Sequence, residues 1–288
     1  MYSMPAELGH PLVLVVDDDS DTRELYRMVL ESVGYRVEEA SRIAEAADTL
    51  KNLVPDVVMT DWLLPDGDGL DVCRAVHARA ATRAISIVAV TGLSFEDGGA
   101  EAKRHGVATL LPKPADPDVI LAAIGQALTA GTERRLRAAA LRAKRYLAQA
   151  RRRAAQQHPD ALESRADAEA LLCRAAAKSG DSVTLMIADD TAHYIAVCGA
   201  THQLTGYQPS ELSEMSVWDL TPVPSAVDPQ GLWNEFIAAG TQEGDYMLRR
   251  RDGRAVSAHY VALANVAPGW HVSAIAALPQ MPTTLGSF

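Results

Sequence analysis

The sequence predicts two folded domains of different class joined by a long helix. The first is an α/β domain with a doubly wound parallel sheet of five strands, and the second is an α+β domain with an antiparallel sheet. Short apolar runs alternate with helical stretches up to about residue 131, whereas after residue 181 strands stand before and after a group of short helices. Net charge also changes along the chain, from −10 over residues 1–130 to +7 over 131–178 and −7 over 179–288. A basic segment therefore separates two acidic domains.

Five short apolar runs define the parallel sheet. Three of them consist almost entirely of Val, Ile and Leu, as expected of strands that helices cover on both faces. The expected strands are residues 12–16, 35–39, 56–60, 85–90 and 107–111.

Helical spacing between these runs predicts which side chains the first two helices bury. Ser20 is the expected N-cap of the first helix. The predicted buried faces are Leu25, Met28, Val29 and Ser32 in the first helix, and Ile43, Ala47, Leu50 and Val54 in the second.

Polar side chains follow four of the five strands at the point where each strand ends. The first strand runs into Asp17, Asp18 and Asp19, and the third ends at Asp61. Thr91 follows the fourth strand, and Lys113 follows the fifth. Ligands of doubly wound sheets bind at this edge, and clustered carboxylates favour a hard cation such as Mg²⁺. A carboxylate beside such a cation can attack phosphorus.

Four motifs at these strand ends resemble the receiver domain of two-component response regulators. They are VLVVDDDSDTRELYR, VVMTDWLLPDGDGLDVCR, VAVTG and LLPKP, and the resemblance covers residues 11–131. It implies that Asp61 is the phosphoacceptor and that Thr91 and Lys113 bind the phosphoryl group. It also implies a Mg²⁺ site made by Asp17, Asp18, Asp61 and the backbone carbonyl of Leu63. Asp19 falls at a variable position and is left out of the core site.

One position departs from the receiver pattern. The family usually has Tyr or Phe three residues before the lysine, and this chain has Leu110 there. We expect phosphorylation to be retained and its coupling to the output surface to differ.

The segment 132–180 is expected to be a helical linker. Pro159 interrupts it. A signalling or dimerising coiled coil, a solvated single helix, and a nucleic-acid contact through Arg151, Arg152 and Arg153 all remain open. The heptad-like seam consists of Leu136, Ala140, Ala143, Leu147, Ala150 and Ala154.

Residues 181–280 are similar to a PAS domain. The similarity rests on LTGYQPSELSEMSVWDLTP and on YMLRRRDGRAVSAHY, whose RDG is a hairpin signal. It implies ligand sensing or domain pairing. No haem or flavin is expected, because no flavin motif surrounds Cys198 and DPQGLWNEFIAAG has no histidine. Surface or core roles are expected for His193, His202, His259 and His271, and core roles for Trp218, Trp233, Phe236 and Trp270.

Cysteine spacing and the chain ends add further expectations. Cys73, Cys173 and Cys198 are odd in number, far apart and form no CxxC pair, so neither a disulfide framework nor a zinc knuckle is expected. No apolar run approaches the ~20 residues of a membrane span, and the start lacks a basic signal-peptide region. These features predict a cytoplasmic protein with short tails at 1–10 and 281–288.

The sequence thus predicts a response regulator of a phosphorelay that is not an enzyme. A histidine kinase or phosphotransfer protein would phosphorylate Asp61, and the linker would pass the change to the PAS-like domain. A downstream protein partner and a homodimer through the linker or the PAS-like domain fit this hypothesis. The alternatives are a nucleic-acid-binding transcriptional regulator that uses the basic linker, and a sensory piece of a hybrid histidine kinase.

Overall fold

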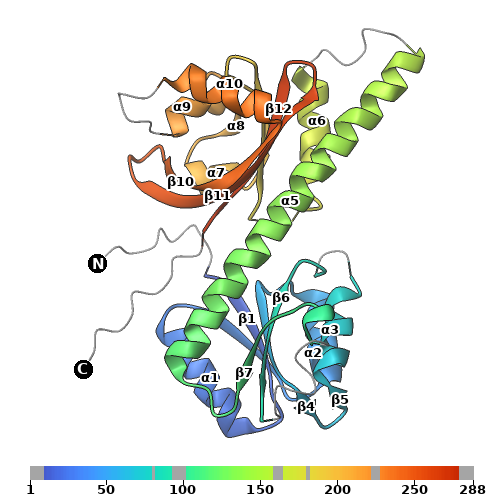
Figure 1. The fold of residues 1–288 in the computed structure, drawn as a ribbon, viewed down its shortest axis with the longest axis vertical. Helices are drawn as coiled ribbons and strands as arrows, with labels where there is room; N and C mark the ends of the chain where they lie inside the picture. Colours follow the sequence, from blue (N-terminus) through green and yellow to red (C-terminus); the bar gives the residue numbers. More distant parts are fainter. Residues whose placement is uncertain are drawn as a thin grey trace. The chain divides into compact units, whose positions relative to one another are not determined.

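The computed structural model describes residues 10–79, 82–92, 102–157, 165–179, 182–221 and 228–278. This part of the chain forms two compact units, of which the first ends at Gly131 and the second begins at Thr132. Each unit has its own five-stranded sheet (Figure 1). The predicted interruption at Pro159, the C-terminal tail and nearly all of the N-terminal tail lie outside the described residues.

The first sheet is parallel throughout, which confirms the predicted α/β class. Its strands lie in the order β2-β1-β3-β6-β7. Each expected strand is present, and the later four begin one residue after the predicted start or at it. The bounds are β1 Leu12–Val16, β2 Arg36–Ala40, β3 Val57–Asp61, β6 Ser86–Thr91 and β7 Val107–Pro112.

Helices cover both faces of this sheet (Figure 1). Helix α1 (Ser20–Ser32) and the first part of α5 (Pro117–Gln157) share one apolar core with the sheet. Helices α2 (Ile43–Asn52) and α3 (Gly69–His77) share a second core on the opposite face. A small hairpin of β4 (Leu63–Leu64) and β5 (Gly67–Asp68) connects β3 to α3.

Two details of α1 differ from the sequence prediction. Asp19 is the N-cap, and its carboxylate accepts a hydrogen bond from the Thr22 amide at 2.7 Å, so Ser20 is already helical. Tyr26 and Leu30 form the buried face, whereas the predicted Leu25 and Met28 are 47% and 55% exposed. A carboxylate caps as well as a hydroxyl, and a helix with apolar residues on two faces buries the one that meets the sheet.

Helix α5 is continuous over 41 residues and contributes to both units. Ile120, Ile124 and Leu128 belong to the core of the first unit. Four residues of the predicted seam are fully buried and pack in the core of the second unit. They are Leu136, Ala140, Ala143 and Leu147. These four residues therefore pack within the chain and are not free to form the interchain coiled coil that the spacing suggested, because the same spacing suits a helix lying on a sheet.

The second sheet is antiparallel, in the order β10-β11-β12-β8-β9. Two of its strands precede the group of short helices and three follow it, in keeping with the expected order of strands and helices. The bounds are β8 Thr184–Asp189, β9 Tyr194–Gly199, β10 Thr241–Arg249, β11 Ala255–Ala267 and β12 Trp270–Ala277.

Two separate cores lie on the faces of this second sheet. One contains the second part of α5 and helix α6 (Arg165–Ala176). The other contains the short helices between β9 and β10 and includes Trp233 and Phe236, as expected for core aromatics. These helices are α7 Thr201–Thr205, α8 Pro209–Leu212, α9 Val217–Leu220 and α10 Pro229–Ala239.

A disulfide joins Cys173 of α6 to Cys198 of β9, so the expectation that these cysteines offer no disulfide framework is wrong for this pair. Cys73 is free and buried. Sequence spacing failed here because the two bonded cysteines are 25 residues apart and meet only once α6 packs beside β9.

None of the helices in the described ranges combines the length and the apolar character that a membrane span requires.

Candidate functional site

Three carboxylates meet at the carboxyl end of the first sheet. Asp17 and Asp18 directly follow β1, and Asp61 is the last residue of β3. Because β1 and β3 are paired neighbours, the ends of both strands lie side by side. One carboxylate oxygen from each of Asp17, Asp18 and Asp61 lies within 4.8 Å of the others. The predicted acidic cluster is therefore present in the structure.

Lys113 connects two of these carboxylates. Its Nζ lies 2.7 Å from Oδ2 of Asp17 and 2.6 Å from Oδ2 of Asp61. The lysine follows β7, and its backbone amide donates to the Thr91 carbonyl at 2.8 Å, which fixes it at the same edge of the sheet. Its peptide bond to Pro114 is cis. One ammonium group thus partly neutralises the cluster through direct contact with two of its three carboxylates.

Burial and charge set the protonation behaviour of this cluster. The side chain of Asp17 is 1% exposed, and burial raises the pKa of its carboxyl group although the hydrogen bond from Lys113 opposes the shift. Burial also acts against the Lys113 ammonium, but its hydrogen bonds to Asp17 and Asp61 outweigh that effect and raise the lysine pKa. With Lys113 charged, ionised Asp17, Asp18 and Asp61 leave an excess of negative charge that a divalent cation would neutralise.

Local hydrogen bonds orient the acidic residues. Arg23 of α1 donates to the Asp17 carbonyl at 2.6 Å, and the Asp19 amide donates to Asp17 Oδ1 at 3.0 Å. The Leu63 amide donates to Asp61 Oδ1 at 3.3 Å. The sequence analysis gave no role to Arg23. The sequence does contain a signal for this contact. An arginine side chain six residues after a strand-end aspartate is long enough to reach back over the first helical turn.

The remaining predicted positions lie around the cluster. Thr91, which is 3% exposed, ends β6, the strand between those that lead to Asp61 and Lys113. Leu110 is half-buried on β7 and packs against the core that contains α2 and α3. The Leu63 side chain is 56% exposed. Asp19, left out of the predicted site, uses its carboxylate as the cap of α1.

Two histidines of the second unit contact different acidic residues and do not form one group. His271 is 3.0 Å from Asp190 through Nε2, and His259 is 2.5 Å from Asp245 through Nδ1. In the part of the chain that the structure describes, the acidic cluster is the one group of His, Cys, Asp or Glu side chains with the spacing of a metal site.

Residues 13–125 match the family model described as the response regulator receiver domain. The first unit is a receiver domain of this family. The matched receiver segment contains the acidic cluster, Thr91 and Lys113.

Similar proteins share this receiver segment. The phosphate regulon transcriptional regulatory protein PhoB of Klebsiella pneumoniae is 32% identical over 112 residues, which cover 39% of this chain and 49% of PhoB. An uncharacterized 14.6 kDa protein of Leptolyngbya boryana is 34% identical over 105 residues, which cover 36% of this chain and 80% of that protein. A response regulator receiver protein from Pseudomonas putida is a solved structure with 30% identity and a TM-score of 0.39, covering 41% of this chain and 98% of that one. The chain spans about half the length of the PhoB relatives that it matches.

Proposed function

We propose that this chain is a response regulator of a phosphorelay in which Asp61 accepts a phosphoryl group from a histidine kinase or a phosphotransfer protein. The observation that carries the proposal is the contact of Lys113 Nζ with Asp61 and Asp17 inside an acidic cluster at the carboxyl end of a receiver sheet. Such a cluster provides a nucleophilic carboxylate, a binding site for a cation and a fixed positive charge, the three components that phosphoryl transfer requires.

The donor set fits Mg²⁺. Asp17, Asp18 and Asp61 provide oxygen ligands that lie within 4.8 Å of one another, and hard divalent cations prefer oxygen. We assign these three carboxylates and the backbone carbonyl of Leu63 as the groups that would hold the cation. When bound, Mg²⁺ neutralises charge that develops on the phosphoryl oxygens.

Each residue of the chain has a separate role in this proposal. The Asp61 carboxylate forms the new bond to phosphorus while the bond from phosphorus to the donor's imidazole nitrogen breaks. Lys113, already in contact with Asp61, turns its ammonium group to the phosphoryl oxygens. Thr91 donates its hydroxyl to the same oxygens from the end of β6. The movement of these two groups shifts the receiver between two states.

The second half of the proposal is a relay through α5. Its support is that one uninterrupted helix supplies Ile124 to the first core and Leu136 and Leu147 to the second. The second unit would act as a PAS-like interaction or sensor domain, in keeping with its antiparallel sheet and its short helices between β9 and β10. Because Leu110 stands where the family usually has an aromatic ring, this relay would depend on Thr91 and α5 and not on ring rotation.

In this proposal the protein acts in the cytoplasm through protein partners and has no enzymatic turnover of its own. The basic linker gives little support to nucleic-acid binding. Arg137 pairs with Glu243 at 2.5 and 2.8 Å, and Arg142 donates to Ser179 and to the Lys178 carbonyl. These two arginines thus serve contacts inside the second unit. Of the arginines predicted to contact nucleic acid, Arg151 and Arg152 are exposed, and the side chain of Arg153 lies outside the part of the chain that the structure describes.

Phosphorylation by acetyl phosphate tests the proposal. The full chain, Asp61→Asn and Asp48→Asn are incubated with acetyl phosphate, with and without Mg²⁺, and intact mass is measured. Asp48 is an exposed carboxylate on α2 and serves as the matched control. We expect Mg²⁺-dependent labelling of the wild type and of Asp48→Asn, and none of Asp61→Asn. Labelling of Asp61→Asn to the wild-type level would rule out Asp61 as the acceptor.

A further inference from the structure

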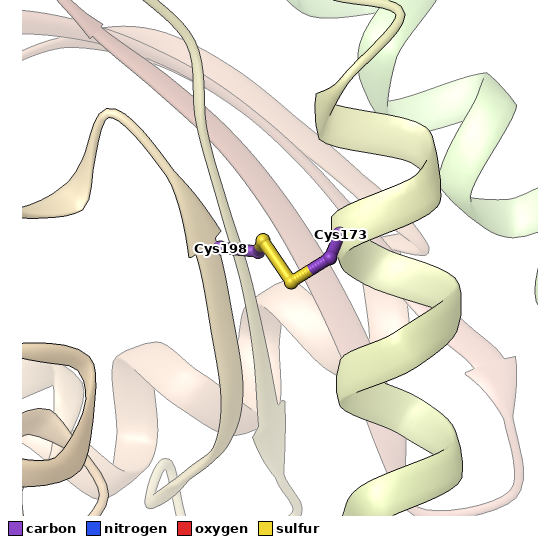
Figure 2. Close-up of a disulfide and its surroundings, with 2 residues drawn as sticks. All are labelled: Cys173 and Cys198. Atoms are coloured by element: carbon purple, nitrogen blue, oxygen red, sulfur yellow. A yellow bond between two sulfur atoms is a disulfide. The ribbon is translucent and has the colours of Figure 1, made fainter.

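The disulfide between Cys173 and Cys198 links helix α6 to β9, one of the two edge strands of the second sheet (Figure 2). The two Cα atoms are 5.1 Å apart, within the range that a disulfide spans without backbone movement. Both residues are half-buried, so neither is sealed inside the apolar core. We propose that this pair is a reversible thiol oxidation site, formed by peroxide and opened by a dithiol, which fastens α6 to β9.

Packing brings the two cysteines together without the bond. Leu172 and Ala175 of α6 are buried in the core on that face of the second sheet, next to strand residues such as Leu185. Cys173 lies between them in the sequence, and Cys198 pairs with Leu185 across β8 and β9. The reduced thiols therefore remain close, and a cysteine oxidised to a sulfenic acid has its resolving thiol within reach.

A covalent bond between α6 and β9 should strengthen the attachment of the helix to the sheet. Strand β9 is at the edge of the sheet and has a ladder partner on one side, β8. Its contact with α6 is made by side chains, including Ile195 beside the apolar core that contains Leu172. A bond between Cys173 and Cys198 adds a direct covalent link between the two elements. Without this bond, the apolar contacts remain to hold α6 against β9.

Cys73 provides an internal reference. It is 1% exposed in the receiver core, and burial raises the pKa of its thiol to about 11. Peroxide reacts with the thiolate, so Cys73 should stay reduced under conditions that oxidise an accessible pair.

The oxidation balances with one peroxide. A cysteine thiolate of the pair attacks one peroxide oxygen, the O–O bond breaks, and the sulfur becomes a sulfenic acid while hydroxide leaves and takes up the thiol proton as water. The second thiol then attacks that sulfur, forms the S–S bond and releases a second water. A dithiol reverses the step by two exchange reactions and leaves as its own disulfide.

Reversibility rests on the proposed function. A response regulator that meets a kinase in the cytoplasm is in a compartment that keeps thiols reduced, where disulfides are usually transient and redox-sensing. The same core that holds α6 holds Leu136 and Leu147 of α5. Reduction would therefore loosen the apolar core on which the second part of α5 packs, and oxidation would tighten it.

Thiol counting on the full chain tests the first part of this proposal. The chain is treated with hydrogen peroxide or with dithiothreitol under native conditions, cleared of reagent, denatured and reacted with a thiol-counting reagent. We expect one thiol after peroxide and three after dithiothreitol, since the chain has three cysteines and one of them is unpaired. Three thiols after peroxide, or one after dithiothreitol, would overturn the proposal as a reversible site.

Hydrogen exchange tests the structural consequence. Amides of α6 should exchange faster in the reduced chain, on the order of tenfold, than in the oxidised chain. Cys173→Ser and Cys198→Ser should each show the fast rate in both conditions, whereas Cys73→Ala should keep the difference. Equal exchange of α6 in both redox states would contradict the proposed fastening. Acetyl phosphate labelling, run in parallel, reports failure of the Asp61 assignment separately.

Discussion

Lys113 Nζ lies 2.6 Å from Asp61 Oδ2, although the two residues are 52 positions apart in the chain. The same ammonium lies 2.7 Å from Asp17. This arrangement places a fixed cation against the carboxylate that we propose as the phosphoacceptor. It also lowers the repulsion among three carboxylates that the fold brings together, so Lys113 stabilises the site in the absence of a metal ion.

Replacing Lys113 should therefore destabilise the receiver domain and make it more dependent on Mg²⁺. Lys113→Ala leaves the Asp17 carboxylate buried without its cation, and we expect a loss of roughly 2 kcal/mol in the free energy of unfolding. Mg²⁺ should restore more stability to the variant than it adds to the wild type, because a bound cation replaces the missing charge. Urea unfolding with and without Mg²⁺ measures both quantities.

Lys51→Ala is the matched control for this experiment. Lys51 pairs with Asp48 on the surface of α2, with both side chains about two-thirds exposed, so its removal should cost under about 0.5 kcal/mol. An equal effect of Mg²⁺ on Lys113→Ala and on the wild type would contradict the compensation of Lys113 by a bound cation, and no effect on either would contradict a cation site at Asp17 and Asp61.

A second prediction concerns the part of α5 that follows Gly131. Leu147 is 1% exposed in the core of the second unit, so Leu147→Ala should lower the free energy of unfolding by about 3 kcal/mol. The loss should not depend on protein concentration, since the side chain packs within one chain. Urea unfolding at two protein concentrations tests this, with Leu141→Ala as control because Leu141 is 52% exposed on the same helix. A concentration-dependent loss would indicate an interchain coiled coil.

A third prediction concerns pH. The Asp219 carboxylate accepts hydrogen bonds from the Ser216 amide and hydroxyl, at 2.7 and 2.8 Å, and these bonds lower the pKa of Asp219 below its ordinary value of 3.8. Because the folded-state pKa is lower than the unfolded one, this carboxylate stabilises the fold above pH 3.8. That contribution is lost as pH falls through the lowered pKa.

Asp219→Asn should accordingly weaken the second unit at neutral pH and reduce its further loss of stability in acid. The urea midpoint of unfolding is measured for the wild type and for Asp219→Asn at several pH values, from pH 6 down to the lowest pH at which both proteins fold. Parallel pH profiles of the wild type and the variant would contradict a stabilising role for this carboxylate.

The sequence predicted all five strands of the first sheet to within one residue, because short apolar runs between helical stretches are typical of buried strands. In the receiver domain, β1 has the predicted bounds, and the acidic cluster follows because strand ends fix where Asp17 and Asp61 lie. Lys113 lies at the same edge of the sheet for the same reason, because it follows β7. The roles assigned to these residues remain predictions that the labelling experiment tests.

Helix faces and long-range contacts were harder to predict. Helix α1 has apolar residues on two faces, and packing on the sheet selects Tyr26 and Leu30. The spacing of the linker seam is compatible with both a coiled coil and a core within one chain. Which of the two forms depends on the sheet on which Leu147 packs. The bond between Cys173 and Cys198 depends on how α6 meets β9, which spacing along the chain does not encode.

The most direct test of the account is hydrogen exchange of the full chain with Mg²⁺ and beryllofluoride, a stable mimic of the phosphoryl group. We predict that amides around Asp61 and Lys113 change their exchange rates in the wild type, and that amides of α5 beyond Gly131 change with them. Asp61→Asn should show neither change. Changes confined to residues before Gly131 would contradict the relay, and identical responses of Asp61→Asn and the wild type would contradict Asp61 as the switch.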